Sequence, residues 1–116
     1  MTSKAIASDA IAKLLTFLPK IQAQSCDRAT LQAFVNALYE THFVFRFDWP
    51  QWIAEADRYS QNPDLLAHAE LLTLRKLMTV YISREHFAPG YLKQQLETDI
   101  LPKMLQRLAR LMDPAS

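Results

Sequence analysis

Residues 65–85 read LLAHAELLTLRKLMTVYISRE, and this stretch decides the fold. It contains neither proline nor glycine, so nothing in it interrupts a helix. Its apolar residues cover a wide arc of a helix: Leu71, Leu74, Leu77, Met78, Tyr81 and Ile82. A helix that is apolar around most of its circumference is normally buried. We therefore expect a central helix near residues 65–85, surrounded by the other helices.

Prolines divide the rest of the chain into shorter helices. The sequence has six prolines but a single glycine, Gly90. Tight hairpins commonly use glycine or asparagine where φ must be positive, so a many-stranded sheet would be hard to build here. Several prolines stand close to a good capping residue and are typical of helix boundaries. The composition therefore favours an all-α protein.

On the N-terminal side, we expect a helix from Ser8 toward Leu18 that is bent or ended by Pro19. A second helix would begin after Asp27 as its N-cap, because apolar residues then recur at the spacing of one buried helix face: Leu31, Phe34, Val35 and Leu38. Asn62 would cap the central helix, with Pro63 at its first position.

On the C-terminal side, a short helix carries residues 91–97, and Asp99 caps the last helix. The apolar stripe of that last helix is long: Ile100, Leu101, Met104, Leu105, Leu108, Leu111 and Met112. Its opposite side carries Lys103, Arg107 and Arg110, which is the usual pattern of a solvated face. The whole chain, residues 1–116, is thus predicted to form a single compact all-α domain of five to six short helices.

The aromatic stretch FVFRFDWPQW, residues 43–52, precedes a further helix that ends near Tyr59. With Asp48 as N-cap, Gln51 falls at N3 and makes a variant of the capping box. Phe47 then falls at N′ and Trp52 at N4, the two positions of a hydrophobic staple. Trp49 is the one large ring that this arrangement does not use.

Composition narrows the classes of function. The formal net charge is +1, so no strong field attracts nucleic acid or an anionic membrane. The single cysteine, Cys26, cannot form an internal disulfide, in agreement with a reducing compartment. The first twenty residues lack the apolar run of a secretory signal, and no long uncharged apolar window exists. We therefore expect a cytoplasmic protein without a membrane segment.

The order of the motifs resembles a family of small bacterial all-helical proteins catalogued only as a domain of unknown function. Its pattern runs LLxFLP, FDWxxW, LRKLLT, RxxRFxxGxL and ILxRL. This chain has LLTFLP at 14–19, FDWPQW at 47–52, LRKLMT at 74–79, and Phe87, Gly90 and Leu92 at the matching spacing. It closes with MLQRL at 104–108. The resemblance covers most of the chain and implies a shared helical fold, but no activity.

One departure from that pattern concerns a charged motif. Where the family pattern has two arginines, this chain has Ser83 and His86, with Arg84 between them. If the family's arginines bind an anion, the resemblance implies that the site is weakened or altered in this chain.

Motifs of catalysis and metal binding are not found. The sequence has no HExxH, CxxC, phosphate-binding glycine loop or GxSxG elbow. Cys26 is followed by Asp27, and a carboxylate beside a thiol disfavours the reactive thiolate. Asp64 and His68 share one helix face, but Glu70 points elsewhere, and a zinc site needs at least three protein ligands. The sequence therefore predicts no catalytic residues, no metal site and no cofactor, and it does not favour an enzyme.

The segment SREHFAPGY, residues 83–91, is the best candidate for a ligand site. Arg84 could pair with a carboxylate or phosphate, and His86 adds a titratable donor beside it. Tyr91 and the unassigned ring of Trp49 would complete the tentative set. A structural role is the alternative, because a helix C-terminus attracts cations through its dipole.

We interpret the chain as a non-catalytic protein-interaction domain that binds a protein partner or forms a homodimer, with the last helix as the candidate dimer surface. One alternative is a protein that binds a small anionic ligand at the corner formed by residues 83–91. A second alternative is a weak nucleic-acid binder with a basic patch made of Arg75, Lys76, Lys103, Arg107 and Arg110, although DNA-binding domains usually have a more basic balance.

Overall fold

The computed structural model describes residues 8–22 and 27–112. Within these ranges every regular element is helical, which confirms the all-α prediction. The α-helices are α1 (Ser8–Leu15), α2 (Leu18–Gln22), α3 (Arg28–Glu40), α4 (Ile53–Gln61), α5 (Leu71–Phe87), α6 (Tyr91–Glu97) and α7 (Ile100–Met112). Two 3₁₀ helices, η1 (Trp49–Trp52) and η2 (Pro63–His68), precede α4 and α5.

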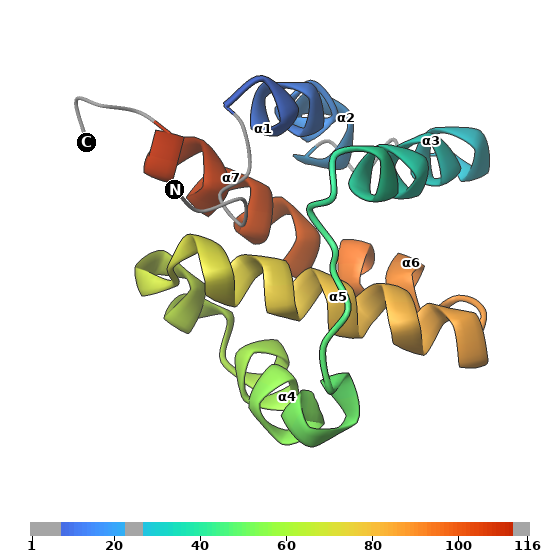
Figure 1. Cartoon of the computed structure of the whole chain (residues 1–116), viewed down its shortest axis with the longest axis vertical. Helices are drawn as coiled ribbons and strands as arrows, with labels where there is room; N and C mark the ends of the chain where they lie inside the picture. Colours follow the sequence, from blue (N-terminus) through green and yellow to red (C-terminus); the bar gives the residue numbers. More distant parts are fainter. Residues whose placement is uncertain (1–7, 23–26, 113–116) are drawn as a thin grey trace.

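Helix α5 is the centre of the molecule (Figure 1). Helices α1, α2 and α3 lie on one side of it and α4 on the other, while α6 and α7 complete the core. Most of the residues from Leu74 to Ile82 are buried, so α5 is covered around most of its circumference. The radius of gyration, 13.3 Å, is close to the value of about 13 Å for a compact chain of this length. The predicted central helix is thus confirmed in its C-terminal two thirds.

The first part of the predicted central helix is a separate element. Residues 63–68 form η2, Ala69 is extended (φ −70°, ψ 142°), and α5 begins only at Leu71. The break is fixed by tertiary contacts, because Leu66 is buried and the Ala69 carbonyl accepts a 2.7 Å hydrogen bond from Arg107 Nε of α7. The prediction of one continuous helix over 65–85 was therefore wrong at this boundary.

The predicted helix caps had mixed outcomes. Asp27 caps α3 as expected, since its Oδ1 accepts a 2.7 Å hydrogen bond from Thr30 N. Asn62 makes no side-chain hydrogen bond that caps η2. Asp99 has a left-handed φ of 72° instead of the extended backbone of an ordinary N-cap. The predicted first helix is divided into α1 and α2, with Pro19 in the first turn of α2 instead of at a helix end.

The capping box at Asp48 was also wrong. Asp48 makes no side-chain hydrogen bond that caps η1, and Gln51 N bonds to the Asp48 backbone carbonyl at 3.2 Å. Pro50 has no N–H to be capped, so the side chain has neither of the donors that a cap would satisfy. The apolar half of the prediction agrees better with the structure, since the rings of Phe47 and Trp52 meet edge to face at 6.4 Å.

Helix α7 completes the core. Its stripe is buried at Ile100, Leu101, Met104, Leu105 and Leu108, against α1, α2, α5, α6 and η2. Leu111, near its end, is 37% exposed. The stripe predicted as a possible dimer surface is thus used within the chain.

Candidate functional site

Arg84, near the end of α5, is held between two neighbouring helices. Its Nη1 donates to Asp57 Oδ1 of α4 at 2.9 Å, and its guanidinium lies 4.4 Å from the centre of the Tyr91 ring of α6. The side chain of Arg84 is 31% exposed. The structure therefore brings together Arg84 and Tyr91 from the predicted site. A ligand anion at this guanidinium would have to compete with the carboxylate of Asp57.

Two tyrosines lie beneath this arginine. Burial raises the pKa of Tyr91, and the nearby guanidinium of Arg84 opposes the rise. Burial also raises the pKa of Tyr81 to about 12, despite its 2.9 Å hydrogen bond to Ser60 Oγ. The two rings are 5.9 Å apart. The interior of this corner is therefore neutral at physiological pH, and the pair of Arg84 and Asp57 covers it.

The turn between α5 and α6 depends on Glu85. Its carboxylate accepts hydrogen bonds from Gly90 N at 3.1 Å and from Leu92 N at 2.8 Å, which are two amides at the start of α6. Gly90 has a left-handed φ of 98°, where a side chain would be strained. Phe87, Gly90 and Leu92 match the spacing of the family pattern. Two of them, Gly90 and Leu92, belong to the turn that the Glu85 carboxylate holds.

Trp49 and His86, the other two predicted site residues, meet at Phe87 instead of at Arg84. The ring of Phe87 is 6.2 Å from the ring of Trp49 and 5.8 Å from that of His86. Phe87 is 76% exposed, the largest exposure among the described large hydrophobic residues, whereas Trp49 is half-buried. The structure therefore separates the four predicted residues into two pairs with different surroundings.

Tyr39 of α3 extends this exposed set of rings across the surface. It is 56% exposed and lies between two hollows, of about 470 and 520 Å³, which both also include Ile82 of α5. His86 lines the smaller hollow and Trp49 lines the larger one. We call this surface the aromatic face: Tyr39, Trp49, Ile82, His86 and Phe87. Tyr39 was missed from the sequence, where it only adjoins the regular stripe of α3, whereas Phe87 lies within the predicted segment 83–91.

Arg75 and Lys76, from the predicted basic patch, hold the aromatic segment in place. Arg75 donates to the carbonyls of Phe43 and His42, at 3.0 and 2.9 Å. The ammonium group of Lys76 lies 5.8 Å from the ring of Phe47 and 5.9 Å from that of Trp52. These two cations therefore have contacts within the chain and lie apart from the basic residues of α7.

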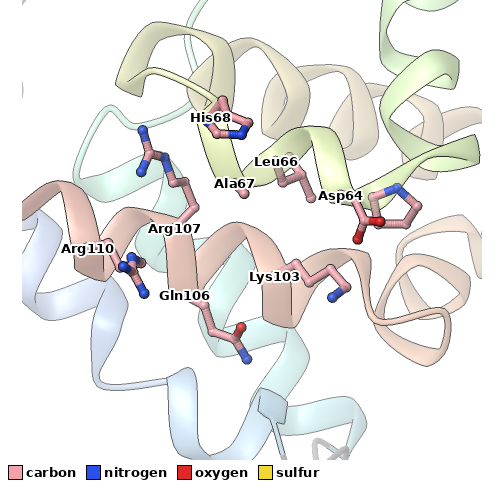
Figure 2. Close-up of a pocket in the computed structure, with 9 residues that line it drawn as sticks. Asp64, Leu66, Ala67, His68, Lys103, Gln106, Arg107 and Arg110 are labelled. Atoms are coloured by element: carbon pink, nitrogen blue, oxygen red, sulfur yellow. The ribbon is translucent and has the colours of Figure 1, made fainter.

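The remaining basic residues line a groove between α7 and η2, which we call the basic groove (Figure 2). Lys103, Arg107 and Arg110 project from α7, and Asp64 and His68 lie across from them on η2. The groove has a volume of about 580 Å³. Arg107 is fixed at its edge by the hydrogen bond from its Nε to the Ala69 carbonyl. The sequence indicated a solvated face here, with a weak nucleic-acid patch as the alternative, because the packing of η2 against α7 is not visible in the spacing of residues.

Metal-ligating residues do not assemble within residues 8–22 and 27–112, where no group of three or more His, Cys, Asp or Glu side chains lies close enough to hold an ion. Of the three residues considered as a metal set, His68 and Asp64 line the basic groove, but Glu70 does not line it. Cys26 lies outside the described residues.

No helix among the described residues is long and apolar enough to cross a membrane. Neither the curated proteins nor the solved structures contain a significant match to the chain. A family of unknown function, DUF6508, matches residues 23–114, which leaves only the first of the sequence motifs, at 14–19, outside the match. The resemblance noted in the sequence is thereby confirmed: this all-helical chain belongs to the DUF6508 family, a family of unknown function.

Proposed function

We propose that this protein is a non-catalytic, cytoplasmic domain that acts by binding a protein partner through the aromatic face. The observation that carries the proposal is the exposure of Phe87 and Tyr39, 76% and 56%, together with the two hollows that Tyr39 lines. Large exposed rings are costly to leave in water, and aromatic residues are enriched at the centres of protein interfaces.

The shape of the aromatic face suits a partner segment with apolar side chains. The two hollows, which share Tyr39 and Ile82, are each large enough to accept a side chain, and Phe87 adjoins them through its ring contacts with Trp49 and His86. Aromatic anchors that insert into such hollows commonly carry most of an interface's binding energy.

The charges at the rim indicate the polarity of the partner. Arg28 lines the smaller hollow and Arg46 lines the larger one, and both are exposed. Glu85 also lines the smaller hollow, but its carboxylate is engaged by the amides of Gly90 and Leu92. We therefore propose a partner whose apolar anchors are flanked by acidic residues. Such complementarity would steer association and fix the orientation of the partner.

A partner different from the chain itself is favoured over a second copy. The stripe of α7 that the sequence offered for a homodimer is buried in the core. The rim of the aromatic face carries Arg28 and Arg46, so two copies meeting through this face would bring like charges together. Light scattering at micromolar concentration is expected to give the monomeric mass, and a dimeric mass that the variant Phe87→Ala abolishes would favour a second copy instead.

The test is a capture experiment with matched variants, followed by mass spectrometry. Wild-type protein and the variant Leu72→Ala are expected to retain the same partner, and Phe87→Ala and Tyr39→Ala are expected to lose it. Leu72 is a suitable control because it is also exposed, 52%, and lies about 22 Å from Phe87 along α5. Titration of the purified partner should then show a loss of about 2 kcal/mol for Phe87→Ala, the usual size of an interface hot spot.

Equal capture by all four proteins would place the interface elsewhere. The absence of any partner that depends on Phe87 or Tyr39 would contradict the proposal. Circular dichroism should show that the variants retain their helices, since both side chains project mainly into solvent.

A further inference from the structure

The basic groove concentrates positive charge on one helix face without a matching acid. Lys103, Arg107 and Arg110 follow one another at i, i+4 and i+7, so they share one side of α7 over about 10 Å. Helix α7 contains no Asp or Glu in residues 100–112. Like charges three and four residues apart repel each other, so this arrangement is unfavourable for an isolated helix.

The element across the groove does not neutralise these cations. Of the side chains that η2 contributes, only Asp64 is acidic, and His68 is a further potential cation (Figure 2). Within residues 8–22 and 27–112, none of the three α7 cations forms an ion pair with a carboxylate. The groove is therefore left with an excess of positive charge on a concave surface, where field lines are focused toward an anion.

Arg107 is prepared for such an anion. Its Nε is used in the 2.7 Å hydrogen bond to the Ala69 carbonyl, which holds the half-buried guanidinium at the edge of the groove. In the described part of the chain, Ala69 is its only hydrogen-bond partner, so its two terminal nitrogens have no competing acceptor there. A guanidinium fixed in this way binds a phosphate oxygen with less loss of side-chain entropy than a free one.

We propose that the basic groove binds a small ligand with more than one phosphate group, such as a polyphosphate chain. Lys103 and Arg110 contact its outer phosphates, and the terminal nitrogens of Arg107 donate to the phosphate between them. A single inorganic phosphate is too small to meet cations that are spread over about 10 Å of helix. The volume of about 580 Å³ is within the range of small-molecule sites. This site is separate from the aromatic face, and it differs from the predicted corner at Arg84, where the guanidinium already has a carboxylate partner.

The test is isothermal titration calorimetry of the full chain with sodium tripolyphosphate, at an ionic strength of about 10 mM, where the Debye length is about 30 Å. We expect saturable binding of one equivalent, and affinity for tripolyphosphate that is at least about tenfold higher than for inorganic phosphate. The double variant Lys103→Gln/Arg110→Gln should lower the tripolyphosphate affinity by more than about tenfold, because each lost contact involves a charged hydrogen bond. Among the described residues neither side chain makes a hydrogen bond or an ion pair, and circular dichroism would check that the helices persist.

The matched control replaces one lysine and one arginine that lie outside the basic groove. Arg46 and Lys93 are exposed and do not line the basic groove, so Arg46→Gln/Lys93→Gln should bind tripolyphosphate within about twofold of wild type, apart from weak long-range effects. The variant Asp64→Asn removes the one carboxylate of the groove and should tighten binding.

The contrary outcomes are equally definite. The proposal is overturned if tripolyphosphate does not bind, or if the control double variant weakens binding as much as the groove variant does. A single-stranded oligonucleotide that binds while tripolyphosphate does not would also overturn it, in favour of nucleic acid. Affinity for tripolyphosphate no higher than for inorganic phosphate would show that the three cations do not act together.

Discussion

Replacing Arg75 with alanine should destabilise the protein more than replacing any other lysine or arginine with alanine. Arg75 of α5 joins the central helix to the segment that links α3 and η1. Its Nε and Nη2 donate to the carbonyls of Phe43 and His42, and its guanidinium lies 4.7 Å from the ring of Phe45. Burial lowers the pKa of Arg75, in keeping with a charge withdrawn from water.

The magnitude follows from these contacts. A hydrogen bond to a charged group contributes about 1.5–3 kcal/mol, with the lower value more suitable for the exposed bond to His42. The cation–π contact adds about 0.5–1 kcal/mol. The lower ends of these ranges together predict that Arg75→Ala lowers the free energy of unfolding by about 3.5 kcal/mol, or the Tm by about 14 °C, for a domain of this size. Arg75→Lys keeps the charge but loses the planar fork, so it should cost about half as much.

Urea unfolding followed by tryptophan fluorescence measures this effect, because Trp49 and Trp52 come directly after the tethered segment. The control is Arg46→Ala, an exposed arginine of the same segment, which should change stability by less than about 0.5 kcal/mol. Hydrogen exchange offers a local measurement, since the amide of Phe45 bonds to Thr79 Oγ1 at 3.2 Å and should lose protection. The reasoning is refuted if Arg75→Ala and Arg46→Ala unfold at the same urea concentration.

Three further changes test other parts of the fold. Because burial raises the pKa of Tyr81 to about 12, the contribution of its neutral phenol to stability is complete below about pH 10 and is lost as the pH rises toward 12. Over that range the free energy of unfolding of Tyr81→Phe should fall less steeply than that of wild type, by about 1.4 kcal/mol per pH unit. Alkaline urea titrations measure this difference, with Tyr39→Phe as the exposed control. Asp27→Ala should lower the Tm through loss of the cap on Thr30 N, whereas Asp48→Ala should leave it nearly unchanged; equal shifts in calorimetry would contradict the caps seen in the structure. Gly90→Ala should cost about 1–2 kcal/mol in chemical unfolding, because φ is 98° and the space around the glycine is open, so only backbone strain contributes; an unchanged midpoint would rule that strain out.

The helical content and most of the core were predictable from local patterns. The stripes of α3 and α7 and the wide apolar arc of α5 have the 3.6-residue period of buried helices, and most of their residues are buried, although Leu31 and Val35 are only partly buried and Leu111 is exposed. Asp27 was predictable as a cap, because an aspartate before an apolar stripe has few other uses. Such features depend on residues that are neighbours in the sequence.

The boundaries that failed depend on residues that are far apart. The break at Ala69 needs Arg107, which is 38 positions away and donates to its carbonyl. Nothing near Ala69 in the sequence indicates this partner, since the stretch from Leu65 to Glu85 has the helix propensity of a single element. The cap predicted at Asp48 failed for a local reason instead: Pro50 has no amide hydrogen, and the amide of Gln51 bonds to the backbone carbonyl of Asp48.

The candidate site shows the same division. Sequence reasoning placed Trp49, Arg84, His86 and Tyr91 together, and the structure brings Arg84 to Tyr91 and both Trp49 and His86 to Phe87. It could not anticipate that Asp57 of α4 would pair with Arg84. Whether any of the four residues binds a ligand stays a prediction.

By itself, the sequence determined that this chain is helical, which of its faces are buried and which family it resembles, because each depends on composition, period or the order of short motifs. Only the tertiary structure decided which charges and rings remain available to other molecules. Arg75 is drawn into contacts with a crossing segment and Arg84 into an ion pair, whereas Lys103 and Arg110 border an open groove. The physical reason is that burial and pairing are properties of contacts between distant segments, and helical period alone cannot distinguish a solvated stripe from a binding surface.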